Sequence, residues 1–203
     1  MNFQDTQLIG VLARAESTVS SLSDLLGGLV EKFAARGYSL YLVGGSVRDA
    51  LLGRLGNDLD FTTPARPDVV KEILDEWAET VWDTGIDFGT VSAAYKGQQI
   101  EITTFRSDSY DGQSRNPEVV YGDTLEGDLV RRDFKVNAMA IELLADASFT
   151  FHDPLHGLQD VADRVLDTPD KPEISFHDDP LRMLRAARFA SQLEFRVADR
   201  VVD

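Results

Sequence analysis

The chain has 203 residues, of which 43% are hydrophobic and 27% are charged, as in an ordinary globular protein of one large or two small domains. It has no cysteine, which excludes disulfides and thiolate metal sites and makes a reducing cytoplasm the expected location. No apolar run approaches the roughly 20 residues that a membrane span needs, so we expect no membrane partner.

The charge balance argues at first against a nucleic-acid partner. The chain carries 20 Lys and Arg against 35 Asp and Glu, a formal net charge of −15, whereas nucleic-acid binders usually present a basic surface. The arginines are unevenly placed, however, and two short segments contain five of them: Arg131, Arg132, Arg182, Arg185 and Arg188. We therefore expect a local basic site on an acidic background, with much of any polynucleotide held elsewhere.

Hydrophobic periodicity predicts alternating helices and strands. In chain order we expect a helix at 17–36, a strand at 40–43, a glycine turn, a helix at 47–52, a strand at 59–63, a helix at 67–79 and a hairpin of strands 90–95 and 99–105. A polar loop at 107–118 follows, then a helix passing into a strand at 133–144, a linker at 167–172 and a helix at 180–193.

The segment Gly44-Gly45-Ser46-Val47-Arg48-Asp49 places two glycines between a predicted strand and a predicted helix. Glycine there lets backbone N–H groups approach an anion at the positive end of the helix dipole. Arg48 lies in the first turn, where a cation is unfavourable unless a phosphate joins it. The alternative is a plain turn in which Arg48 pairs with Asp49, and the segment alone does not decide between the two.

Asp58 and Asp60 lie two residues apart on a predicted strand, so both side chains project from the same face. Leu59 and Phe61 then face the core. Two carboxylates placed in this way are able to bind the pair of Mg²⁺ ions that two-metal phosphoryl transfer requires. Glu101 lies opposite the isoleucines of a later strand and is a candidate third carboxylate, with a solvent-facing residue as an equal alternative.

The segment Arg131-Arg132-Asp133 is followed by Asn137 about one helical turn later. Guanidinium groups bind phosphate oxygens in a bidentate manner, so this group is a candidate for holding the phosphate and ribose of a nucleotide. Taken alone, the segment is more typical of a solvated helix start.

Asp179, Arg182 and Arg185 recur every three residues and share one face of the last predicted helix, while Leu181, Leu184 and Ala187 form an adjacent apolar stripe. A carboxylate accepts from an exocyclic amino group, and an arginine donates to an unprotonated ring nitrogen. Cytosine and adenine both present that pair of groups, whereas uracil and guanine reverse it. An Asp–Arg pair can therefore select C and A without a template, although a capped helix with ion pairs is the plainer interpretation of the segment alone.

Two His-Asp dipeptides, His152-Asp153 and His177-Asp178, are also found in metal phosphohydrolases. That type of site needs further His and Asp ligands on helices, and these dipeptides fall in predicted loop and cap positions. We therefore do not expect a phosphohydrolase.

Taken together and in this order, the motifs resemble the class II tRNA nucleotidyltransferases, the family that includes bacterial CCA-adding enzymes and poly(A) polymerases. The resemblance runs from about residue 38 to residue 195, and each motif alone is weak. The motifs are Leu42-Val43-Gly44-Gly45-Ser46-Val47-Arg48-Asp49, Asp58-Leu59-Asp60-Phe61, Glu101-Ile102-Thr103-Thr104-Phe105-Arg106, Arg131-Arg132-Asp133-Phe134, Asp153-Pro154-Leu155-His156-Gly157 and Asp179-Pro180-Leu181-Arg182.

The resemblance implies an α+β fold: a nucleotidyltransferase head of the DNA polymerase beta type, with a mixed sheet flanked by helices, followed by a helical neck. We place the head at residues 1–168 and the start of the neck at 169–203. The family continues into a helical body and tail that hold the tRNA, and we expect most of that RNA-binding surface to lie beyond this chain.

The resemblance also implies roles for individual residues. Asp58 and Asp60 bind Mg²⁺ and activate the RNA 3′-hydroxyl, with Glu101 as a further catalytic candidate. The nucleotide is held by Gly44, Gly45, Arg48, Arg132, Asp133 and Asn137, and its base is read by Asp179 and Arg182, with Arg185 and Arg188 supporting the pocket. The 107–118 loop matches the family's flexible loop. Asp178 departs from the pattern, since many relatives carry Glu there.

The implied reaction is template-independent transfer of CMP and AMP from CTP and ATP to tRNA 3′ ends. The segment Gly85-Ile86-Asp87-Phe88-Gly89-Thr90-Val91 resembles CCA-adding enzymes more than proteobacterial poly(A) polymerases. Poly(A) or A-only addition remains the alternative, followed by a non-catalytic nucleotide-binding module and a small-molecule nucleotidyltransferase.

Overall fold

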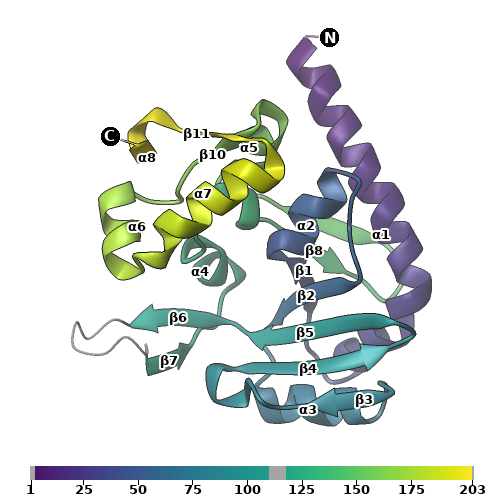
Figure 1. Ribbon diagram of the computed structural model, residues 1–203. Helices are drawn as coiled ribbons and strands as arrows, with labels where there is room; N and C mark the ends of the chain where they lie inside the picture. Colours follow the sequence, from purple (N-terminus) through teal and green to yellow (C-terminus); the bar gives the residue numbers. More distant parts are fainter. Residues whose placement is uncertain (1–2, 110–117, 203) are drawn as a thin grey trace.

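The computed structural model describes residues 3–109 and 118–202, which form a mixed sheet flanked by helices (Figure 1). The helices are α1 (Phe3–Ala35), α2 (Gly44–Leu51), α3 (Pro67–Asp75), α4 (Leu125–Val130), α5 (Gly157–Asp163), α6 (Pro172–Asp178), α7 (Leu181–Leu193) and α8 (Asp199–Val202), with 3-10 turns η1 (Ile86–Phe88) and η2 (Lys135–Asn137). The strands are β1 (Leu40–Val43), β2 (Asp58–Thr63), β3 (Thr80–Trp82), β4 (Thr90–Tyr95), β5 (Gln98–Thr104), β6 (Arg106–Ser109), β7 (Glu118–Tyr121), β8 (Ala140–Leu143), β9 (Phe149–His152), β10 (Val165–Leu166) and β11 (Arg196–Val197).

The central sheet has seven strands in the order β3-β4-β5-β2-β1-β8-β9. In it β2 and β5 run parallel, and the other neighbouring strands run antiparallel. The parallel register sets Asp60 directly beside Glu101. The expected mixed sheet is therefore present, and its one parallel pair joins the two strands that carry the candidate carboxylates.

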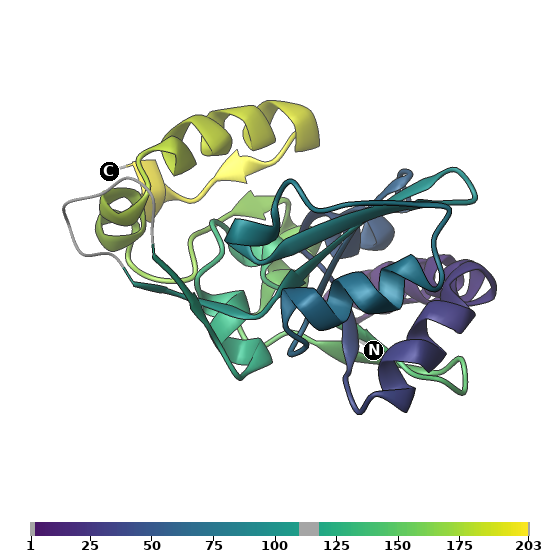
Figure 2. The same cartoon turned by 90° about the horizontal axis from the view of Figure 1, so that it is seen from below.

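A large part of the hydrophobic core lies on one face of this sheet, under α1 and α3 (Figure 2), and the same buried cluster continues into α2, α5 and α7. Phe61 and Ile102 are buried in the same cluster as Phe33 of α1 and Ile73 of α3. Because successive strand residues alternate between faces, the acidic residues of β2 and β5 project from the opposite face. That face lies on the side of α7 (Figure 2).

Several predicted boundaries are wrong. The first helix begins at Phe3 rather than at residue 17, because its buried stripe continues backwards through Val19, Ala15 and Val11. The two glycines lie in the first turn of α2 rather than in a separate loop. The helix expected at 67–79 ends at Asp75, and the chain turns there into β3.

Other segments also differ from expectation. The loop predicted at 107–118 is flanked by strand, because β6 reaches Ser109 and β7 begins at Glu118; the rest of that prediction, 110–117, lies outside the described residues. The helical part predicted within 133–144 is only the 3-10 turn η2, since the chain passes at once into β8. Helices α4, α5 and α6 were not expected.

The C-terminal segment folds back onto the chain before the linker. Strand β11 pairs in parallel with β10, and Asp167 accepts from Lys135 and from Arg200, each at 2.7 Å. The apolar stripe on α7 is exposed at Leu181 and Leu184, and the helix buries Ala186, Phe189 and Leu193 instead. The apolar positions at 181 and 184 therefore do not hold α7 against the described part of the chain.

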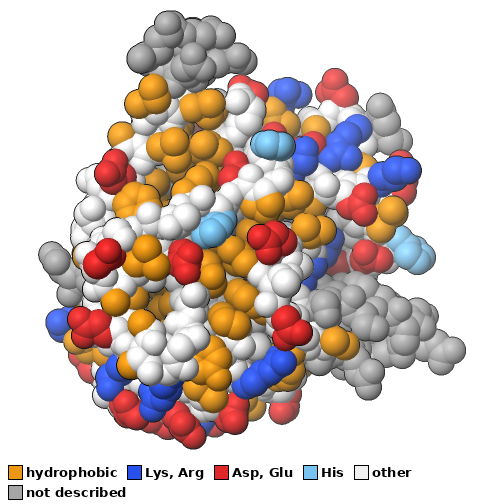
Figure 3. Space-filling view, turned by 180° about the vertical axis from the view of Figure 1, so that it is seen from behind, with side chains coloured by type: hydrophobic (Ala, Val, Ile, Leu, Met, Phe, Trp, Pro, Cys, Tyr) orange, Lys and Arg blue, Asp and Glu red, His pale blue; other side chains and the backbone are white. Residues whose placement is uncertain are grey.

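Within the described residues, no helix combines the length and the apolarity needed to cross a bilayer. On the face opposite to Figure 1, acidic side chains are spread among apolar ones, and the visible basic side chains stand in small separate groups (Figure 3). The expected local concentration of arginines is therefore not on this face of the molecule.

Candidate active site

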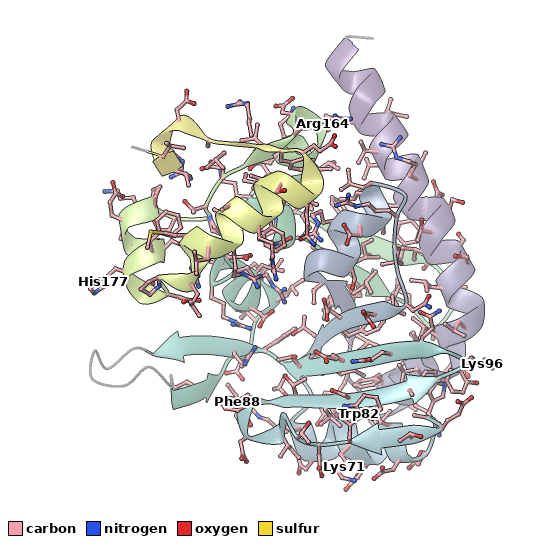
Figure 4. All side chains as sticks on the ribbon, viewed as in Figure 1. Lys71, Trp82, Phe88, Lys96, Arg164 and His177 are labelled. Carbon is pink, nitrogen blue, oxygen red and sulfur yellow. The ribbon has the colours of Figure 1, made fainter. Side chains whose placement is uncertain are left out.

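A cavity of about 680 Å³ lies where the acidic face of the sheet meets α2, α7 and the residues that directly follow α4. Figure 4 shows nitrogen-tipped side chains gathered between these three helices. Every candidate residue from the sequence except Arg188 lines the cavity: Gly44, Gly45, Arg48, Asp58, Asp60, Glu101, Arg132, Asp133, Asn137, Asp179, Arg182 and Arg185. Segments more than a hundred residues apart in the chain thus meet in one place, while the roles of these residues stay predictions.

The acidic side of the cavity is built by β2 and β5. Asp58 and Asp60 alternate with the buried Leu59 and Phe61, and Glu101 is the register partner of Asp60. Burial raises the pKa of Asp60 above its ordinary value, and the charges of Glu101 and Asp58 add to this effect. Like charges therefore crowd this part of the sheet, and a bound cation would relieve their repulsion.

Ser46 is a site residue that the sequence did not indicate. Its hydroxyl accepts a hydrogen bond from the backbone N–H of Asp60 at 2.9 Å and lies 3.4 Å from the backbone oxygen of Asp58, to which it donates. Ser46 is almost fully buried, in the first turn of α2. It fixes the strand that carries the two aspartates against the glycine turn.

Arg48 has partners of its own in the chain. Its Nε and Nη2 donate to the two carboxylate oxygens of Asp49, both at 3.0 Å, and its Nη1 donates to Oδ1 of Asn137 at 2.7 Å. The plainer interpretation, a pair between Arg48 and Asp49, is therefore present. Arg48 still lines the cavity, where its positive charge acts on Asp60 and partly offsets the rise in that carboxyl's pKa.

Gly44 is needed for space as well as for conformation. Its φ of +65° lies in the left-handed region that favours glycine. A Cβ there would lie 2.9 Å from Nη1 of Arg132, a distance that real Cβ atoms essentially never show. The same Cβ would lie 4.0 Å from Oδ2 of Asp60. The glycine therefore lets the arginine and the aspartate approach each other across the turn.

Asp133 joins α7 to the rest of the site. Its Oδ1 accepts from the backbone N–H of Phe134 and from Nδ2 of Asn137, each at 2.9 Å, and its Oδ2 accepts from Nε of Arg185 at 2.7 Å. Both oxygens of this carboxylate thus accept hydrogen bonds from the protein itself, apart from any that a nucleotide sugar would donate.

The two candidate base readers lie at the start of α7. Oδ1 of Asp179 accepts from the backbone N–H of Leu181 at 3.0 Å, just before α7, although the N-cap of this helix is Pro180. Arg182 donates from Nη1 to Oγ of Ser175 at 2.8 Å and from Nη2 to the backbone oxygen of Arg131 at 2.7 Å. Ser175 was missed because it belongs to α6, a helix that the sequence analysis did not anticipate.

Arg188 lies outside the lining of the cavity. Its guanidinium carbon lies 4.8 Å from the centroid of the Phe189 ring, which Arg48 and Arg185 also approach, at 5.2 and 5.1 Å. Three cations thus surround one buried aromatic ring. Phe189 was not singled out from the sequence, where it reads as an ordinary core residue.

The donor set suits a divalent cation that shares its coordination with a substrate. Among the described residues, no group of three or more His, Cys, Asp or Glu side chains is gathered closely enough to hold a metal by itself. Mg²⁺ is commonly bound by one or two carboxylates together with substrate phosphates and water, rather than by an all-protein cage. Asp58 and Asp60 supply such a carboxylate pair beside the arginines.

The histidines give no support to a phosphohydrolase. His177 is exposed and points outward from α6, away from the cavity (Figure 4). His152 lies against the edge of Tyr41, with ring centroids 5.8 Å apart. Neither histidine lines the cavity.

Comparison with known proteins agrees with this arrangement. Residues 40–167 match the family model described as the Poly A polymerase head domain. The CCA-adding enzyme of Lactobacillus helveticus (strain DPC 4571) is 43% identical over 165 residues, and that of Listeria monocytogenes serotype 4a (strain HCC23) is 42% identical over 170. The alignments cover 81% and 83% of this chain but 39% and 41% of those proteins, so the chain spans about two fifths of their length.

Solved structures show the same fold. The Bacillus stearothermophilus CCA-adding enzyme in complex with CTP superposes with a TM-score of 0.73 and 36% identity, over 88% of this chain and 41% of that one. A tRNA nucleotidyltransferase complexed with a primer tRNA and an incoming ATP analogue gives 0.72 and 33%, over 85% and 47%. The expected nucleotidyltransferase head fold is thereby confirmed. With the family model matching well over half of its residues, the chain belongs to the Poly A polymerase head domain family.

Proposed function

We propose that this chain is the catalytic head of a nucleotidyltransferase that adds CMP and AMP, from CTP and ATP, to the 3′ end of tRNA. The supporting observation is that one cavity gathers the carboxylate pair, the arginines that we propose bind phosphate and the Asp179–Arg182 pair that we propose reads the base, from segments far apart in the chain. Similar proteins carry the name CCA-adding enzyme, and one of them is seen with CTP.

In the proposed chemistry, the acidic side of the cavity would activate the hydroxyl that reacts. Asp58 and Asp60 would hold Mg²⁺, which when bound supplies Lewis-acid activation of the RNA 3′-hydroxyl and charge neutralisation at the α-phosphate. Glu101, the neighbour of Asp60 in the sheet, keeps this region negative and favours a cation there. In-line attack forms the new P–O bond at the α-phosphate, breaks the bond to the β-phosphate and releases pyrophosphate.

The proposed nucleotide contacts lie on the arginine side. Arg132 forms one side-chain hydrogen bond, from Nη2 to Asp128, and within the described residues its Nε has no partner. Its Nη1 forms no hydrogen bond within the described residues and stays available to phosphate oxygens, whereas its Nε is buried. Asp179 and Arg182 would present one acceptor and one donor edge to the base, which matches cytosine and adenine and mismatches uracil and guanine.

We also propose the division of the chain into a head at residues 1–168 and the start of a neck at 169–203. Asp167 lies at this boundary and pairs with Lys135 on one side and Arg200 on the other, so the two parts are tied together. A cytoplasmic location, the compartment that suits a chain without cysteine, completes the proposal.

The proposal is tested by incubating the chain with Mg²⁺, each labelled nucleoside triphosphate singly, and tRNAs lacking the last one, two or three nucleotides. Stepwise addition of C, C and A is the expected result. Long A tails from ATP alone would replace CCA addition by poly(A) addition, and addition of a single A would indicate an A-adding enzyme. Incorporation that is absent, or equal in the wild type and Asp58→Ala, would leave only a nucleotide-binding module.

A further inference from the structure

Asp128, on α4, is a fully buried carboxylate to which the reaction outlined above gives no role. Its Oδ1 accepts from Nε and Nη2 of Arg131, at 3.2 and 2.9 Å, and from the backbone N–H of Arg106 at 3.3 Å. Its Oδ2 accepts from Nη2 of Arg132 at 2.9 Å. Burial raises the pKa of this carboxyl, but the guanidinium groups of Arg132 and Arg131 outweigh burial and hold the pKa below its usual range.

Arg132 has a second carboxylate within its surroundings. A Cβ on Gly44 would lie 2.9 Å from its Nη1 and 4.0 Å from Oδ2 of Asp60, so both groups lie beside the same glycine, and the charge of Arg132 lowers the pKa of Asp60 against the effect of burial. The two side chains nevertheless form no ion pair, whereas Arg132 and Asp128 do, at 2.9 Å. Asp128 and Asp60 thus compete for one guanidinium group, and Asp128 holds it.

An ion pair between Arg132 and Asp60 would disable both partners. Asp60 would lose the lone pairs that bind a divalent cation, and Arg132 would lose the N–H groups that face a phosphate. Removing the negative charge at residue 128 leaves Arg132 without a counter-ion in a partly buried position, which favours its transfer to Asp60.

We propose that Asp128 is a positioning residue that holds Arg132 beside Asp60 without letting the two pair, and so keeps Asp60 open to the divalent cation. This inference rests on the proposed function, because it assigns the cation to Asp58 and Asp60. Asp128 touches neither the substrate nor the cation; it acts through Arg132 alone.

The test measures Mn²⁺ binding to the chain without nucleotide, by the electron paramagnetic resonance signal of free Mn²⁺. In Asp128→Asn we expect the affinity to fall about 10- to 100-fold, because a cation must now displace the guanidinium from Asp60. In Arg132→Ala the competitor is absent, so adding Asp128→Asn to that variant should change the affinity less than about twofold. The matched control is Asp123→Asn, which removes the same charge from an exposed side chain and should leave Mn²⁺ affinity unchanged.

Circular dichroism shows whether each variant is folded. If Asp128→Asn unfolds because two arginines lose their shared carboxylate, Asp128→Asn with Arg131→Gln leaves only Arg132 without that carboxylate and should show the same loss. Unchanged Mn²⁺ affinity in a folded variant, or an equal loss with Arg132→Ala present, would overturn the inference and leave the proposed function intact. A wild-type chain whose Mn²⁺ binding does not depend on Asp58 and Asp60 would overturn both.

Discussion

The two sides of the cavity are held in place in different ways. We call Asp58, Asp60 and Glu101 the carboxylate wall, and Arg132, Arg182 and Arg185 the arginine wall. The carboxylate wall stands on two strands paired in the sheet, and strand alternation with a single register places all three side chains. Each arginine is instead held by a hydrogen bond to a residue from another turn or segment: Asp128, Ser175 or Asp133.

The position of the carboxylate wall thus has a local cause, the pairing of two strands, whereas the position of the arginine wall depends on contacts between turns or segments. A substitution in the carboxylate wall changes the chemistry of the cavity but leaves the sheet under it intact, because the backbone ladder and the buried face of β2 do not depend on the acids. A substitution in the arginine wall, or in one of its partners, changes the packing between segments as well. We therefore expect substitutions in the carboxylate wall to change activity without changing stability. Substitutions in the arginine wall should change both.

The largest expected effect is on the carboxylate wall. Asp60→Asn should reduce nucleotide incorporation at least about 10³-fold, because the carboxylate pair that holds the cation is lost. The thermal midpoint should stay unchanged or rise slightly, since burial and neighbouring acids raise the pKa of Asp60 and its ionised form is unfavourable in the folded state. Single-turnover incorporation and thermal unfolding measure the two effects, with the exposed Asp68→Asn as control; incorporation within tenfold of the wild type contradicts the assignment.

Arg182→Lys tests base reading on the arginine wall. Lysine keeps the charge but cannot reproduce the two directed hydrogen bonds to Ser175 and to the backbone of Arg131. We expect the preference for CTP over UTP, measured as the ratio of kcat/KM values, to fall about 100-fold. Exposed Arg196→Lys is the control. A preserved ratio with a lower kcat for both nucleotides would show that Arg182 supports the structure and does not read the base.

The same difference between the walls explains what the sequence reveals. Asp58 and Asp60 are visible as a period-two pattern, and the hydrophobic alternation around Glu101 places it on the matching face. Nothing local marks Ser175, because it acts on an arginine that lies on another helix. Asp128 lies three and four residues before its two arginines, a spacing that an ordinary exposed ion pair on a helix also has. Only the ordered set of motifs, compared with a known family, predicts that α7 faces the sheet.

Element boundaries follow the same logic. The hairpin of β4 and β5 is predicted well, since alternation and the Lys96-Gly97 turn are local signals. The length of α1 and the existence of α6 depend on which surfaces bury them, which no short window of sequence contains. For the same reason, the apolar spacing of Leu181 and Leu184 does not say which stripe of α7 meets the core, and both side chains are exposed.

A smaller effect is expected where α7 joins the cavity. Asp133→Asn keeps a side-chain oxygen that accepts from the N–H of Phe134. It replaces the 2.7 Å ion pair with Arg185 by a contact between Nε and either an amide N–H donor or a neutral oxygen. We expect unfolding free energy to fall by about 2 kcal/mol and nucleotide affinity to fall with it. Urea unfolding and equilibrium binding of CTP provide the measurements, and Asp87→Asn on the exposed turn η1 is the control. If the variant loses CTP binding but keeps its full unfolding free energy, Asp133 contacts the ligand and does not stabilise the fold.

The smallest effect concerns a half-buried acid outside both walls. Asp160, on α5, differs from Asp128 in that its Oδ2 has no hydrogen-bond partner among the described residues. Burial, opposed by Lys135 and reinforced by Asp167, Asp163 and Asp153, raises the pKa of Asp160 to about 6. The folded protein therefore binds a proton that the unfolded chain has already released between about pH 4 and pH 6, so unfolding free energy falls as the pH rises through this window.

Asp160→Asn should remove this fall in unfolding free energy with rising pH. We expect the variant to match the wild type near pH 4 and to exceed it by about 1–2 kcal/mol at pH 8, a figure reduced from the full pKa difference because the side chain is partly solvated. Urea unfolding at pH 4, 6 and 8 measures the gap, and nucleotide incorporation should not change. A constant gap across this range would mean that the substitution acts through packing. Equal stability at pH 8 would show that Asp160 ionises without cost, and that a half-buried carboxylate here does not need the arginine partners that Asp128 has.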